Sequence, residues 1–168
     1  MTKIYAVIAL HCIPNEFREI GTKVVLCDGN GLDNHCHIHG INTKSNYVVF
    51  KKDEGEFSNV PHIVYPMLSD QYIAVGFSFE EKTHSVCIGN IRSFSNGGEG
   101  MFYGDSGELT GFKGGGVFYM KSGALMGIAR GRDLDGRDTQ RYRDELEVIS
   151  AQVIGGHIEI FDDKPFSV

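Results

Sequence analysis

The stretch MFYGDSGELTGFKGGGVFYMKSGALMGIARG, residues 101–131, contains two glycine-bounded loops and the apolar runs that follow them. The first loop is Gly104–Gly107, which reads GDSG, and the second is Gly111–Gly116, which reads GFKGGG. Only the first contains a serine. Glycines beside a nucleophile let backbone N–H groups converge on a developing oxyanion. Whether this chain carries out chemistry therefore depends on which loop occupies the nucleophile corner of the fold.

Length and composition predict one β-rich domain. The chain has 168 residues, 22 glycines, 4 prolines and no tryptophan, which is enough chain to bury a sizeable core. Its Val, Ile, Tyr and Phe residues come in short runs bounded by turn residues, as in barrels and sandwiches. The expected strands are Ile4–Leu10, Thr22–Cys27, Tyr47–Lys51, Ile73–Phe79, His84–Ile91, Gly116–Met120 and Ala124–Arg130.

The last part of the chain is less regular. Lys121–Gly123 separates two apolar runs and predicts a hairpin in which glycine supplies the positive φ. The charge-rich segment Arg130–Arg143 predicts a solvated loop. For Glu145–Ile154 the β-branched content favours a strand over a helix, and we expect a short helix in His157–Asp163.

Charge and apolar content exclude several partner classes. The net charge is −6 and no basic stripe is available to neutralise phosphates, so we expect no nucleic-acid partner. No apolar run approaches the ~18 residues of a membrane span, so we expect no membrane partner. The Ile4–Leu10 run is short for a signal peptide. Without a secretory signal, four irregularly spaced cysteines predict free thiols and a cytoplasmic location; they are Cys12, Cys27, Cys36 and Cys87.

Three segments, in this order, resemble the trypsin-like (chymotrypsin-fold) serine proteases. Ala6–Ile13 resembles the catalytic-histidine segment, and Ser69–Val75 resembles the segment that places the acid before Ile-Ala-Val. Gly111–Ile128 resembles the nucleophile loop with its following strand and hairpin. The resemblance implies that residues 1–168 form a single trypsin-like peptidase domain, all-β, with a double β-barrel and a short C-terminal helix. Because only ten residues precede His11, we expect the family's first strand to be missing.

The family's chemistry needs a serine, an imidazole that takes its proton and a carboxylate that orients the imidazole. Aligned without gaps, Tyr72 stands at the acid position and Lys113 at the nucleophile position. A protonated lysine cannot attack a carbonyl, and it would put a cation where the oxyanion forms. In this alignment the oxyanion loop consists of Gly111, Lys113 and Gly114, and the site is inactive.

The alternative is an active site made of His11, Asp70 and Ser106, with Glu108–Lys113 as an insertion. The oxyanion donors would then be the N–H groups of Ser106 and Gly104. The spacing from Lys113 to the Gly127–Ile128 pair fits the family, whereas the spacing from Ser106 is too long. Three plainer interpretations stay open: Asp105–Gly107 as a turn, His11 as a structural histidine, and Asp70 as a turn cap.

The specificity pocket of such a protease would be walled by Gly127, Ile128 and Gly131. Arg130 or Arg132 beside it would favour acidic side chains.

A second concentration of reactive side chains is Asp33–His39. On a strand, His35, His37 and His39 would share one face, and imidazoles two residues apart can chelate Zn²⁺. The alternative is an exposed histidine-rich edge strand with Cys36 and Ile38 facing the core. Apart from such a zinc ion we expect no cofactor.

Three functions remain open at this point. The first is a catalytically impaired protease-fold protein that binds a protein or peptide, through the old substrate cleft or through the N-terminal edge of the sheet, where a partner or a second copy would add a strand. The second is an active serine endopeptidase that uses His11, Asp70 and Ser106. The third is a metal-binding module centred on His35–His39.

Overall fold

The computed structural model describes residues 3–78, 83–95, 100–107, 112–130 and 145–163. The chain divides into two compact units. Unit 1 is the chain up to Val60 together with the chain from Gly155, and unit 2 is Pro61–Ile154. A double-barrel fold has two such units within one domain, and the single domain stays a prediction.

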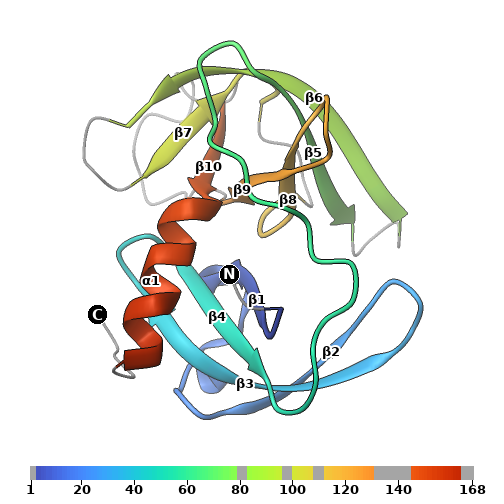
Figure 1. The fold of residues 1–168 in the computed structure, drawn as a ribbon, viewed down its shortest axis with the longest axis vertical. Helices are drawn as coiled ribbons and strands as arrows, with labels where there is room; N and C mark the ends of the chain where they lie inside the picture. Colours follow the sequence, from blue (N-terminus) through green and yellow to red (C-terminus); the bar gives the residue numbers. More distant parts are fainter. Residues whose placement is uncertain (1–2, 79–82, 96–99, 108–111, 131–144, 164–168) are drawn as a thin grey trace. The chain divides into compact units, whose positions relative to one another are not determined.

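Unit 1 contains a four-stranded antiparallel sheet in the order β1-β4-β3-β2 (Figure 1). Burial alternates along Lys23–Cys27 and the first part of Asp33–Asn42, while the first four residues of Tyr47–Lys52 are all buried, and the buried side chains form a cluster that includes Cys36, Ile38 and Phe50. The strands are β1 Tyr5–Ala9, β2 Lys23–Cys27, β3 Asp33–Asn42 and β4 Tyr47–Lys52, with 3-10 helices at Leu10–Cys12 and Asn15–Phe17.

Unit 2 is a closed antiparallel barrel in the order β10-β7-β6-β5-β8-β9. Its interior is filled by large side chains that are fully buried, among them Tyr72, Phe102 and Phe112. The strands are β5 Gln71–Ser78, β6 Thr83–Phe94, β7 Met101–Gly104, β8 Gly116–Tyr119, β9 Leu125–Ala129 and β10 Leu146–Ser150.

All seven expected strands are present, within a few residues of their predicted ends. The strand within Glu145–Ile154 is confirmed as β10, but helix α1 covers Ala151–Asp163 and so begins before His157. Gly155 and Gly156 in fact lie inside α1. The helix forms across them because Ala151, Ile154 and Ile158, at helical spacing, are all buried.

The hairpin at Lys121–Gly123 is confirmed. Gly123 has φ +70°, and its N–H donates to the carbonyl of Tyr119 at 2.8 Å. Residues 131–144, which include most of the predicted solvated loop, lie outside the described residues. Within the described part of the chain, no helix is long and apolar enough to cross a membrane. The four cysteines are all free, as expected.

Candidate functional site

His11 lies in the 3-10 helix that follows β1, and its imidazole contacts a side chain of the same unit. Asn46 Nδ2 lies 2.8 Å from His11 Nδ1. The backbone reinforces this pair, because the N–H of Leu10 donates to the carbonyl of Asn46 at 2.9 Å. Asn46 therefore stands where a carboxylate would orient the catalytic imidazole of a protease.

Asn46 is held in this position by an unusual backbone conformation. It has φ +59°, a left-handed conformation that asparagine tolerates better than most residues. It ends the turn between β3 and β4, in which the N–H of Ser45 donates to Asn42 Oδ1 at 2.8 Å. The turn therefore brings an amide to the histidine, where a serine protease would have an acid.

The contact also sets the proton on the ring. With the amide placed so that Asn46 Nδ2 faces the ring, this nitrogen donates, His11 Nδ1 accepts, and a neutral ring carries its proton on Nε2. A carboxylate would do the reverse: it would accept from Nδ1–H and leave Nε2 ready to take a proton from a serine. A ring that carries its proton on Nε2 does not act as a base at that nitrogen.

The sequence interpretation missed Asn46. A usable signal was present, because Asn46 directly precedes Tyr47-Val48-Val49, an apolar strand that resembles the Ile-Ala-Val segment. We assigned the acid position to the later segment at Tyr72, which lies in unit 2 at the start of β5.

Tyr72 and Asp70 each have a local role within unit 2. Tyr72 is fully buried in the barrel core. Asp70 Oδ2 accepts the N–H of Met67 at 2.9 Å, and the N–H of Asp70 donates to the Met67 carbonyl at 3.1 Å. Asp70 thus caps a turn before β5, which is the structural alternative that the sequence offered.

Ser106, the serine of GDSG, follows β7 and is bonded to Tyr72. The two hydroxyl oxygens lie 2.8 Å apart, and the N–H of Ser106 donates to Tyr72 Oη at 3.2 Å. Burial raises the pKa of Tyr72, so the phenol stays neutral and is a poor base for the serine. Both the hydroxyl of Ser106 and its N–H, a proposed oxyanion donor, are therefore engaged inside the unit.

The tetrapeptide around Ser106 is further anchored by Asp105. Its carboxylate accepts the N–H of Asn90 at 2.6 Å and the Nε of Arg92 at 3.2 Å. The bond from the Asn90 backbone is the main cause that lowers the pKa of Asp105. Gly104 is needed because a Cβ there would overlap the Tyr72 ring and hydroxyl. These contacts make GDSG a tightly fixed turn.

Lys113 is exposed at the corner of a different turn. The N–H of Gly115 donates to the carbonyl of Phe112 at 2.9 Å, and Gly114 has φ +80°. The N–H of Gly114, assigned to the oxyanion loop, donates to the carbonyl of Ala129 at 2.7 Å. The N–H of Gly114 is therefore used in a hydrogen bond within the barrel. Gly111 lies outside the described residues.

The two loops occupy different positions along β5. Ser106 contacts Tyr72, whereas Gly115 packs so closely on the carbonyl of Val75 that a Cβ would overlap it. Tyr72 and Val75 are three residues apart on one strand, a distance of about 10 Å. Ser106 does not lie in the turn that carries Lys113.

The predicted pocket wall is a packing surface as far as it is described. Gly127 lies on β9, where a Cβ would overlap the carbonyl of Ile149 on β10, and Ile128 is buried beside it. Arg130 Nη1 lies 3.6 Å from Glu147 Oε2, so its charge is matched within unit 2. Two residues named for this wall and its charge, Gly131 and Arg132, lie outside the described residues.

The histidine cluster lies on β3, with Cys36 and Ile38 buried as expected. The prediction of an edge strand is wrong, because β3 pairs with both β2 and β4. His37 Nδ1 contacts Asp53 Oδ1 at 2.7 Å, and the ring centroids of His37 and His39 lie 6.3 Å apart. Among the described residues, no group of three His, Cys, Asp or Glu side chains could hold a metal ion. The structure therefore gives no support to a zinc site at His35, His37 and His39.

A further polar cluster of unit 1, not foreseen from the sequence, joins α1 to the sheet. The Tyr47 hydroxyl bonds His157 Nδ1, and Asn42 Nδ2 lies 3.2 Å from the same nitrogen. Burial lowers the pKa of His157 and raises the pKa of Tyr47 to about 12. Both groups are therefore neutral near pH 7, which lets them share this site.

Comparison with known proteins identifies the fold of this chain. No protein-family model and no curated protein matches the chain. Among solved structures, the serine endoprotease from Yersinia pestis matches with TM-score 0.72 and 18% identity over 96% of this chain and 55% of that one. The fold is that of the trypsin-like serine proteases. The HtrA-type protease AlgW, solved with a decapeptide, matches with TM-score 0.75 and 14% identity over 98% of this chain and 50% of AlgW. The chain thus spans about half the length of these proteases.

Proposed function

We propose that this chain is a trypsin-like protease-fold protein that has lost peptidase activity and acts by binding a protein or peptide. The observation that carries the proposal is the bond between Ser106 and the buried hydroxyl of Tyr72. A nucleophilic serine must present its oxygen to an imidazole and then to a carbonyl. The oxygen of Ser106 is instead held by a neutral phenol that takes no proton from it.

The histidine side of the site supports the same conclusion. Asn46 in place of an acid favours the tautomer of His11 that carries its proton on Nε2. In a serine protease, replacing the orienting aspartate with asparagine lowers kcat about 10⁴-fold. At the position aligned with the nucleophile, Lys113 contributes a cation. The proposed role needs no cofactor.

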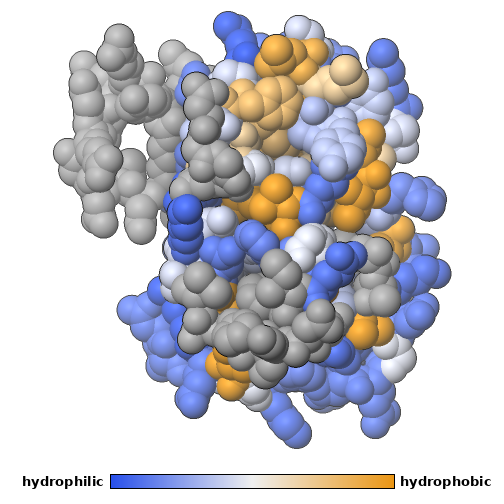
Figure 2. Space-filling model, turned by 60° about the vertical axis from the view of Figure 1, so that its left-hand side comes forward, coloured by the Kyte–Doolittle hydropathy of each residue, from blue (hydrophilic) through white to orange (hydrophobic). Residues whose placement is uncertain are grey.

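Protein or peptide is the partner class that fits the retained fold. Unit 2 exposes large apolar side chains, and apolar residues stand out in orange on the face drawn in Figure 2. Apolar side chains that form a contiguous exposed patch mark protein-interaction sites. AlgW, which shares the fold, was solved with a decapeptide. Three of the most exposed apolar side chains described in unit 2 lie close together in sequence, namely Tyr65, Met67 and Leu68, at 74%, 67% and 60%.

A peptide library derived from a proteome tests both parts of the proposal. Wild-type protein incubated with the library is expected to create no new peptide termini by mass spectrometry. The same protein, immobilised, is expected to retain a reproducible subset of the peptides. New termini that disappear with Ser106→Ala would instead establish a working endopeptidase, and the absence of any retained peptide would refute the binding role.

A further inference from the structure

Strand β2 is an edge of the unit 1 sheet and pairs with β3 alone among the described strands. The N–H of Ile38 donates to the carbonyl of Thr22 at one end, and the N–H of Asp28 donates to the carbonyl of Leu32 at the other. Because bonding residues alternate along an antiparallel pair, Thr22, Val24, Leu26 and Asp28 face β3. The N–H and C=O groups of Lys23, Val25 and Cys27 then point to the open edge.

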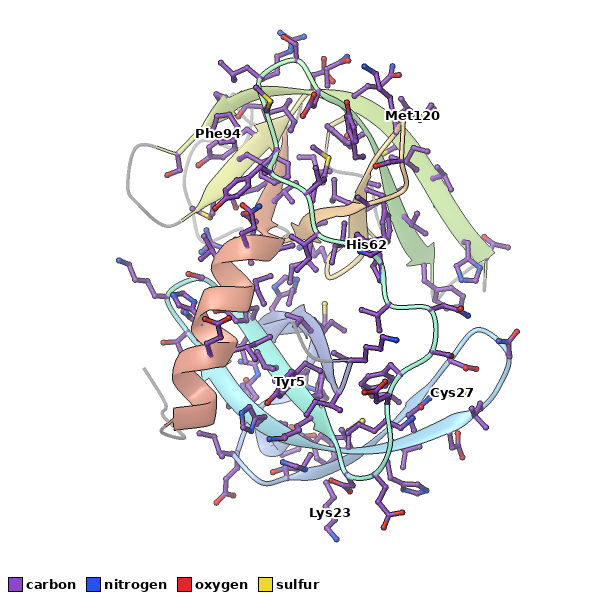
Figure 3. The ribbon with its side chains drawn as sticks, viewed as in Figure 1. Tyr5, Lys23, Cys27, His62, Phe94 and Met120 are labelled. Carbon is purple, nitrogen blue, oxygen red and sulfur yellow. The ribbon has the colours of Figure 1, made fainter. Side chains whose placement is uncertain are left out.

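The side chains of those three residues lie on one exposed face. Lys23 pairs with His37, Val25 with His35 and Cys27 with Asp33 in the β2–β3 register. Val25 is 53% exposed although it is apolar. Figure 3 labels Lys23 and Cys27 at the two ends of β2 and shows the Lys23 side chain directed outward from the ribbon.

A groove of about 600 Å³ adjoins this face, and Val25 contributes to its wall. Its charged lining consists of three carboxylates and two lysines, which are Asp33, Asp53, Glu54, Lys23 and Lys52. Asp53 is paired with His37. Among the described residues no cation forms an ion pair with Asp33, so this carboxylate can accept a lysine from a second chain.

We propose that two copies of this chain associate by pairing their β2 edges antiparallel about a two-fold axis that passes between the two Val25 residues. The register then places Lys23 of one copy directly opposite Cys27 of the other. Asp33 of that second copy is the next residue across the sheet. Two strand spacings, about 10 Å between Cα atoms, separate the lysine from the aspartate, a gap that the two side chains bridge. The two-fold axis repeats this contact, so that the dimer contains two pairs of Lys23 with Asp33.

A second copy fits the edge better than an unrelated strand because the edge is self-complementary. A two-fold contact uses the same patch on both copies. Here Lys23, at the start of β2 in one copy, lies near Asp33, which pairs with the last residue of β2 in the other copy. Val25, which is apolar, lies at the centre of this interface, where the Val25 of the other copy covers it. Apart from Lys23, β2 lacks the charges and prolines that usually block an open edge. Five residues make a small interface, so the association is weak and depends on concentration.

Sedimentation velocity on the full chain over the micromolar range tests the pairing. The wild type is expected to shift from monomer to dimer as its concentration rises. Lys23→Glu alone, or Asp33→Lys alone, is expected to weaken the dimer at least about tenfold, because each puts two like-charge pairs in the contact. The double variant, Lys23→Glu with Asp33→Lys, is expected to restore it. A strict monomer, or a double variant no better than the singles, overturns the proposal.

Crosslinking tests the register independently. In a Cys27→Ser background, Val25→Cys is expected to form an intermolecular disulfide under mild oxidation, since paired Cα atoms would lie about 5.5 Å apart. Val86→Cys is the matched control, because Val86 is as exposed (60%) but lies on β6. Equal crosslinking of the two variants refutes the register. Neither result bears on peptidase activity, so the self-association and the proposed function fail separately.

Discussion

The corner around His11 and the loop around Ser106 differ from a serine protease site in opposite ways. In unit 1 the histidine has a side-chain partner at Nδ1, but this partner is the amide nitrogen of Asn46 and not a carboxylate oxygen. In unit 2 the serine lies in a Gly-Asp-Ser-Gly sequence, but its hydroxyl is bonded to the buried Tyr72. A sequence motif therefore says less about chemistry than the group that its side chain bonds.

We expect the largest loss of stability from a substitution that crowds the Tyr72 ring beside Ser106. We expect Gly104→Ala to lower the free energy of unfolding by about 3 kcal/mol, because the new Cβ overlaps a Tyr72 ring that has no room to move. Urea denaturation measures the loss. Gly156→Ala is the control, since no atom lies near its Cβ and alanine is the better helix former, and it should stabilise by up to about 1 kcal/mol. Equal effects would show that Tyr72 does not fill the space above Gly104.

The hydroxyl of Tyr72 can be removed alone. Tyr72→Phe is expected to cost about 1.5 kcal/mol, because Ser106 loses the partner of both its hydroxyl and its N–H. Tyr65→Phe, at a side chain that is 74% exposed, should stay within about 0.5 kcal/mol. If the two variants unfold at the same urea concentration, the Tyr72–Ser106 bond does not stabilise the loop.

The two units should also differ in their response to pH. Burial holds the pKa of His157 below its ordinary 6.5, so the folded state binds fewer protons than the unfolded state near that pH. Unit 1 therefore keeps this contribution above pH 6.5 and loses it as the pH falls further. The pKa of Asp105 is held below its ordinary 3.8, so unit 2 keeps its contribution above pH 3.8 and loses it only in stronger acid.

Hydrogen exchange resolved by residue, at pH 7.5 and near pH 5.5, measures this difference after correction for intrinsic rates. Protection in β3 and β4 should fall relative to β6 and β7 on acidification. His157→Gln should remove most of that loss. A loss of equal size in the variant would assign it to another group.

The smallest expected effect lies at the histidine itself. Asn46→Asp should change stability by no more than about 0.5 kcal/mol, since aspartate also accepts a left-handed conformation. It should move the neutral His11 proton from Nε2 to Nδ1, which imidazole ¹⁵N shifts report. The shifts of His37, which pairs with Asp53, serve as the control. An unchanged His11 spectrum would mean that Asn46 does not set the tautomer.

Much of the fold could be predicted from the sequence because strand signals are local. The short apolar runs of β5 and β6 and the turn at Gly123 are readable within a few residues. Helix α1 was predicted too short because two glycines weaken a helix locally, while the burial of Ile154 and Ile158 depends on the tertiary structure. Burial is a property of the whole chain, and no window of sequence contains it.

The site was harder to predict because its contacts join distant residues. Tyr72 and Ser106 are 34 positions apart, and His11 and Asn46 are 35 apart. Alignment gave Lys113 and Ser106 as alternatives and assigned the acid position to Tyr72, whereas the residue in contact with His11 is Asn46. A search of the sequence for an acidic residue does not find Asn46. Only its contact with His11 Nδ1 in the structure identifies it.

Intact-mass spectrometry after treatment with a fluorophosphonate tests most directly whether Ser106 is a nucleophile. We expect folded wild-type protein to keep its mass, and Tyr72→Phe and Asn46→Asp to do so as well. A single adduct on the folded wild type, mapped to Ser106 and absent from Ser106→Ala, would contradict it.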